Sequence, residues 1–107
     1  MKVRELLESL DAIKPNEIRD DIKLRWVGEV EGRALCEICK ADPTKIKRAV
    51  GEEDELSVPE PYCRVYLLYL IAMVELAAGD LSAYSSVSAE YEKAFCEFGK
   101  WYIRNKG

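Results

Sequence analysis

Apolar residues recur at helical spacing along most of the chain and break off at prolines and glycines. Near the N-terminus, five of them share one helical face: Val3, Leu6, Leu7, Leu10 and Ile13. This spacing predicts a short amphipathic helix over residues 3–12. Pro15 and Asn16 form a turn signal, so the chain is expected to leave the helix near residues 14–16.

A second amphipathic helix is predicted over residues 20–40, with Asp20 or Asp21 capping its first turn. Its core face consists of apolar residues spaced by four, widened by two neighbours: Ile22, Trp26, Val30, Ala34 and Ile38, with Val27 and Leu35. The charged residues are expected on the opposite, solvated face: Lys23, Arg25, Glu29, Arg33 and Glu37.

The most apolar stretch lies in the middle of the chain and predicts a third helix over residues 61–78. Pro61 suits the first helical position, because the N–H that proline lacks would be unpaired there. Gly79 suits the left-handed position after a helix. Asp80 can cap a following helix at once, over residues 81–104, so these two helices are expected to form an antiparallel αα-hairpin.

The third helix is apolar on nearly all sides and is therefore expected to be buried all round. Either the other helices cover it or a neighbouring subunit does. Likewise, the aromatic face of the fourth helix either packs on the third or meets a partner helix. The candidate packing or oligomer surface comprises Tyr66, Tyr69, Met73, Tyr84, Tyr91, Phe98 and Trp101.

Residues 41–60 interrupt the helical pattern and predict an irregular loop, with residues 46–50 and 56–58 as candidates for short extended pieces. The acidic run over residues 52–55 is contiguous, whereas calcium loops place their ligands at alternate positions, so a solvated turn is expected. The chain is thus predicted to be a single all-α domain over residues 1–107. The expected architecture is a four-to-five-helix bundle with a long C-terminal αα-hairpin.

Composition narrows the classes of function. The 107 residues fit one domain, and 49% hydrophobic and 34% charged residues are typical of a folded chain. A net charge of −4 argues against nonspecific nucleic-acid binding. The apolar run of residues 65–78 contains Glu75 and is shorter than the roughly 20 residues of a membrane span. The N-terminus lacks the apolar segment of a secretory signal, so the protein is expected in the cytoplasm with free thiols.

Candidate chemistry is limited to one cysteine pair. Because the sequence has no histidine, the usual general base and the commonest metal ligand are missing. Cys36 and Cys39 form a CxxC pair. A redox pair is expected at the N-terminus of a helix, whereas this pair falls near the C-terminal end of the predicted second helix. A zinc site would need Cys63 and Cys96, or carboxylates, as further ligands. We interpret the cysteines as small apolar residues and expect neither enzymatic activity nor a cofactor or metal.

The sequence resembles a known family over about residues 3–104. Residues 58–104 read VPEPYCRVYLLYLIAMVELAAGDLSAYSSVSAEYEKAFCEFGKWYIR. This stretch resembles the second half of small head-tail connector proteins of tailed bacteriophages and prophages: a VPxPY entry, a tyrosine-rich helix, a Gly-acidic turn and a last helix with repeated Tyr and Phe and a basic end. Upstream, LLESLDAIKPNEI and IKLRWVGEVEGRALCEI are similar to the family's opening.

The resemblance implies an α-helical structural protein whose copies form a homo-oligomeric ring. Such a ring joins the portal to the tail-completion proteins, and viral DNA only passes through its channel. The protein would then be found in the virion, and in the host bacterial cytoplasm during assembly and DNA packaging. The alternative is a small bacterial helical protein-interaction or regulatory module that binds a partner through the aromatic face of its last helix.

Overall fold

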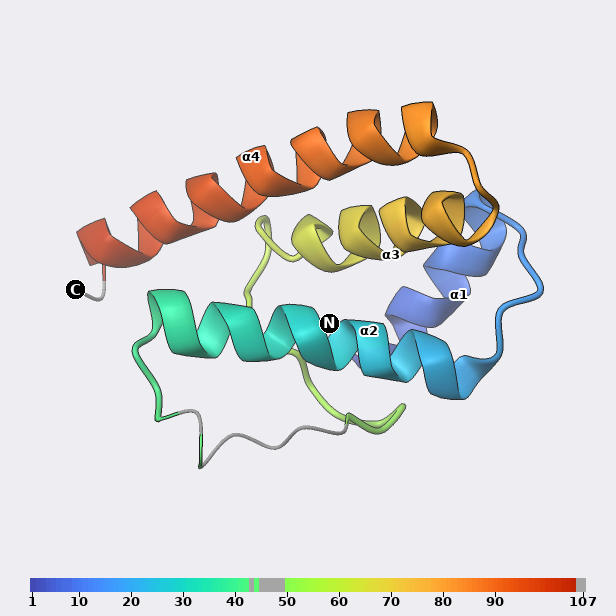
Figure 1. Ribbon diagram of the computed structural model, residues 1–107. Helices are drawn as coiled ribbons and strands as arrows, with labels where there is room; N and C mark the ends of the chain where they lie inside the picture. Colours follow the sequence, from blue (N-terminus) through green and yellow to red (C-terminus); the bar gives the residue numbers. More distant parts are fainter. Residues whose placement is uncertain (43, 45–49, 106–107) are drawn as a thin grey trace.

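The computed structural model describes residues 1–42, 44 and 50–105. They form α1 (Val3–Ile13), α2 (Asp20–Arg33), the π-helical turn η1 (Ala34–Ile38), α3 (Arg64–Ala77) and α4 (Leu81–Asn105) (Figure 1). Over the described ranges there is no strand, only an isolated antiparallel bridge between Lys2 and Glu55. The predicted all-α class is confirmed. Residues 56–58 are not a strand, and the other expected extended piece, over residues 46–50, lies outside the described residues except for Val50.

The central position belongs to α3. It packs against α1, α2 and α4, and it lies between α2 and α4 in Figure 1. Six of its fourteen residues are buried: Val65, Tyr66, Leu70, Ala72, Val74 and Glu75. Other helices of the same chain therefore cover the buried faces of α3, which is the first of the two alternatives that the sequence left open for this helix. No described helix is long and apolar enough to cross a membrane.

The connection between α3 and α4 follows the predicted chemistry. Gly79 has φ +81°, the left-handed conformation that a Cβ atom disfavours. Its N–H donates to the carbonyl of Leu76 (3.0 Å), and the N–H of Asp80 donates to the carbonyl of Glu75 (3.0 Å), a complete Schellman motif. The Asp80 carboxylate accepts a hydrogen bond from the N–H of Ala83 (3.0 Å) and caps α4. The αα-hairpin is thus confirmed.

The beginning of α3 differs from the prediction. Pro61 does not open the helix, which starts three residues later at Arg64. The Glu60–Pro61 peptide bond is cis, and the N–H of Tyr62 donates to the carbonyl of Pro59 (2.8 Å). Pro61 therefore occupies the third position of a turn over residues 59–62, and α3 begins after that turn.

The face of α2 toward the core also differs from the prediction. Val27, Val30 and Ala34 are buried, but Ile22 and Trp26 are only half-buried, so the buried face is rotated by about one position. Lys23, assigned to the solvated face, is buried and donates to the Asp11 carboxylate (2.9 Å). This ion pair with α1 makes the burial of a charged side chain possible. The predicted helix over residues 20–40 is realised as α2 followed by η1, which ends at Ile38.

Candidate functional site

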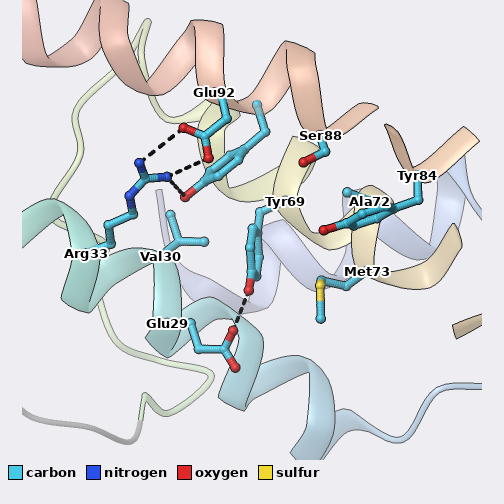
Figure 2. A pocket seen from close by; sticks show the side chains of 10 residues that line it. Glu29, Val30, Arg33, Tyr69, Ala72, Met73, Tyr84, Ser88 and Glu92 are labelled. Atoms are coloured by element: carbon cyan, nitrogen blue, oxygen red, sulfur yellow. Dashed lines mark hydrogen bonds and ion pairs between the residues drawn. The ribbon is translucent and has the colours of Figure 1, made fainter. Parts of the chain in front are cut away.

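A cavity of about 290 Å³ lies between α2, α3 and α4 and is partly open to solvent. Four of the aromatic-surface candidates, Tyr69, Met73, Tyr84 and Tyr91, line it. The remaining lining residues are Glu29, Val30, Arg33, Ala72, Ser88 and Glu92 (Figure 2). We call this set the interhelical cavity. Each of the three helices contributes to its lining, and the rings of Tyr69 from α3 and Tyr91 from α4 lie side by side in it.

Arg33 forms one wall of the interhelical cavity. Its guanidinium donates two parallel hydrogen bonds to Glu92 (3.0 and 3.1 Å) and a third to the Tyr91 hydroxyl (3.0 Å). Its Nε donates to Glu37 (2.5 Å), and the group lies 4.0 Å from the ring centroid of Phe95. Burial alone would lower the pKa of Arg33, but these hydrogen bonds raise it above its ordinary value. The guanidinium is thus permanently charged and bound to carboxylates of both η1 and α4.

Tyr69 and Glu29 form a further part of the cavity lining. The Tyr69 hydroxyl donates to the Glu29 carboxylate, and the Tyr69 ring lies 5.1 Å from the ring of Tyr91 (Figure 2). Burial raises the pKa of Tyr69, and the hydrogen bond to Glu29 raises it further. The Tyr69 phenol therefore stays protonated and holds Glu29 at the cavity mouth, where that side chain is exposed.

The charge of the interhelical cavity is negative. Two carboxylates, Glu29 and Glu92, line it together with one guanidinium. The ion pairs described in this region join Arg33 to Glu92 and Glu37, and none joins a cation to Glu29. Since aromatic faces and carboxylates both attract cations, the cavity can bind the ammonium or guanidinium group of a partner.

The other three aromatic candidates lie elsewhere. Tyr66 is fully buried, and its hydroxyl donates to Glu31 (2.7 Å) and accepts from the N–H of Val58 (2.9 Å). Phe98 is 2% exposed and packs with half-buried Trp101, whose ring lies 6.2 Å away. The seven candidates therefore do not form one surface. Tyr66 and Phe98 are core residues of the chain itself.

Sequence reasoning missed the charged part of the interhelical cavity. Glu29 and Arg33 were assigned to the solvated face of α2, and Glu92 was not singled out. Glu29, Arg33 and Glu37 are spaced by four and so form one row on the helix. That row borders the apolar face of α2. A charged row in this position is expected to contact a neighbouring helix.

The cysteines do not come together as a ligand set. All four are free: Cys36 and Cys39 are half-buried, Cys63 is buried and Cys96 is exposed. Burial raises the pKa of the Cys63 thiol, which disfavours the thiolate that binds metals. Across the described residues, no three Cys, Asp or Glu side chains are grouped so that they could hold a metal ion.

Comparison with protein-family models, with curated proteins and with solved structures finds no match for the chain. Its function is therefore inferred from the fold, from the interhelical cavity and from the residues that carry the sequence resemblance.

Proposed function

We propose that the chain is a structural assembly protein, the head-tail connector of a tailed phage or prophage. Copies of it form a ring between the portal and the tail-completion proteins, and viral DNA passes through the centre of the ring. The protein acts by binding other proteins and carries out no catalysis. It belongs to the virion and is present in the host cytoplasm during assembly.

The αα-hairpin carries this proposal. The residues that resemble connectors are the ones that build it: the tyrosine-rich α3, the Gly79–Asp80 turn and the aromatic α4. α4 has 25 residues and α3 has 14, so α4 extends beyond α3 at its C-terminal end (Figure 1). At about 1.5 Å per residue, the eleven additional residues span about 16 Å. Part of this extension packs on η1, where Ile38 lies close to Gly99, whereas Lys100, Ile103 and Arg104 are exposed and available for contact with another protein.

The interhelical cavity supports a role in protein contact. Its groups suit the recognition of a cationic side chain, and the Arg33 network that forms its wall also joins α2 to α4. The net charge of −4 supports the passive role of DNA, since binding to phosphates requires an excess of basic groups.

Deletion of the gene tests the proposal. Without the connector, particles should contain DNA-filled heads that lack tails, because the joint between head and tail is missing. Supplying the gene in trans should restore tailed particles and infectivity, and the genes beside it should encode portal, capsid and tail proteins. Complete infectious virions from the deletion strain would overturn the proposal.

A small bacterial helical interaction module is the second candidate, favoured by the open side of the interhelical cavity. It predicts that the gene lies apart from virion genes and that basic peptides bind the purified protein. Recovery of the protein from host cells that produce no particles, in complex with a host protein, would favour this candidate over the first.

A further inference from the structure

We infer that the interhelical cavity is the docking site for the basic C-terminal end of α4 from a second copy of the chain. This inference rests on the proposed function and deepens it, because a ring of identical subunits needs a contact between two different surfaces of each subunit. Both surfaces of this contact, the cavity that accepts and the helix end that is inserted, are present on the described part of one chain.

The acceptor half is acidic and small. The interhelical cavity holds two carboxylates against one guanidinium, and that guanidinium is already bound by Glu92 and Glu37. A volume of about 290 Å³ lies at the lower limit for small-molecule sites, which begin near 300 Å³. The cavity therefore fits the end of one long side chain. Glu29 at its mouth supplies the charge for a cation, and Tyr84 and Tyr69 supply aromatic faces.

An apolar strip adjoins the acceptor. Leu76 follows Tyr69 and Met73 in one row of α3, and Leu81 precedes Tyr84 in one row of α4. Leu76 is 39% exposed and Leu81 is 66% exposed. The acceptor surface thus combines a negative cavity with exposed leucines one helical turn away, and a matching partner should present a cation beside an apolar residue.

The donor half has this combination. Lys100, Ile103 and Arg104 lie at spacings of three and four, so they share one face of α4. All three are exposed, and Ile103, at 68%, is the most exposed large apolar residue in the described part of the chain. Arg104 can enter the cavity of a second copy while Ile103 packs on its leucines, and Lys100 lies close enough to face Glu29 or Glu92.

The chain cannot make this contact with itself. Glu92, the lining residue of α4 that is nearest in sequence, and Arg104 lie on the same continuous helix, twelve residues apart. A helix rises about 1.5 Å per residue, so at least about 18 Å of rigid helix separates Arg104 from the cavity. The donor must come from another copy. Such a head-to-tail contact leaves a donor and an acceptor unused at the ends of every open assembly, so it closes into a ring or continues as a filament.

Charge reversal tests the contact in the full-length protein. Sedimentation velocity over a concentration series should show that the mass of the wild type increases with concentration. Glu29→Arg and Arg104→Glu should each raise the dissociation constant about tenfold, and more at low salt than at high salt. The double variant Glu29→Arg/Arg104→Glu should recover association, because the reversed charges again attract each other.

Matched controls separate this contact from general charge effects. Glu90→Arg and Lys93→Glu make the same charge changes at exposed positions of α4 that do not line the cavity, and they should leave association unchanged. Glu29→Gln keeps an acceptor for Tyr69 and removes only the charge, so it should weaken association without lowering the melting temperature. Circular dichroism checks that every variant folds.

The outcomes distinguish this inference from the proposed function. Assembly of the wild type with no change in either single variant would overturn the docking site and leave the connector role standing. A wild type that stays monomeric at all concentrations, or a cavity that binds the free guanidinium compound agmatine while the Arg104 variant assembles normally, would also overturn it. Infectious virions from the deletion strain would instead overturn the proposed function.

Discussion

Glu31 is a buried carboxylate on α2 that joins three segments of the chain. It is 8% exposed and accepts hydrogen bonds from the N–H and the hydroxyl of Ser57 and from the hydroxyl of Tyr66 (2.7 Å). A buried charge is costly unless it is hydrogen-bonded, and here the donors come from α3 and from the segment before it. This carboxylate therefore fixes residues 57–58 against the helices.

The Tyr66 hydroxyl should contribute measurably to stability. Tyr66→Phe removes the donor to Glu31 and the acceptor for the N–H of Val58, while the ring remains. We expect the free energy of unfolding in urea to fall by about 2 kcal/mol, the range for a hydrogen bond to a charged group. The matched variant Tyr84→Phe, on a half-buried tyrosine, should lose less. Equal losses in the two variants would contradict the role of this hydroxyl.

Alkaline pH should destabilise the fold through its buried tyrosines. Burial raises the pKa of Tyr66, Tyr69 and Tyr91, although Arg33 opposes the shift at Tyr91. Above a pH of about 10, the unfolded chain loses phenolic protons that the folded chain keeps, so stability is fully present below that pH and decreases above it. Urea unfolding at about pH 9 and pH 11, with tyrosinate absorbance as the probe, should show this loss. Full ionisation near pH 10 with the fold intact would contradict it.

At the scale of elements, the features that could be predicted from the sequence are those that depend on residues adjacent in the chain. The Schellman turn at Gly79 and the cap at Asp80 depend on residues adjacent in sequence, so both ends of the connection were predicted. The start of α3 was predicted wrongly because Pro61 can open a helix or occupy a turn, and the sequence does not distinguish the two. The face of α2 was wrong because Lys23 is buried through a partner on α1, twelve residues away.

The Asp80 cap should stabilise α4 independently of the rest of the fold. Asp80→Ala removes the acceptor for the N–H of Ala83 and should lower the free energy of unfolding by about 1 kcal/mol. Asp80→Ser keeps a capping oxygen and should lose only a small part of this. Chemical denaturation measures both variants, and an alanine variant as stable as the serine variant would show that the cap is unimportant.

At the scale of the whole molecule, the interhelical cavity could not be predicted, because three elements build it. The aromatic residues were singled out from the sequence, but their division into a core group and a cavity group depends on how α2 crosses the hairpin. Arg33 forms an ion pair with Glu92, fifty-nine residues away, and no local sequence pattern predicts that pair. The packing of α3 by α1, α2 and α4 was one of two open alternatives, and the fold supports it for the buried faces.

The described part of the molecule is thus an all-α bundle with an acidic, aromatic cavity between α2, α3 and α4 and with exposed basic residues at the C-terminal end of α4. Electron microscopy of the purified protein mixed with the portal protein that the proposed function assigns to it tests the assembly role most directly. Images should show a closed ring of the chain bound to one end of the portal, and the Arg104→Glu variant should bind without closing the ring. Portals that remain bare at saturating concentrations of the wild-type protein would contradict the assembly role.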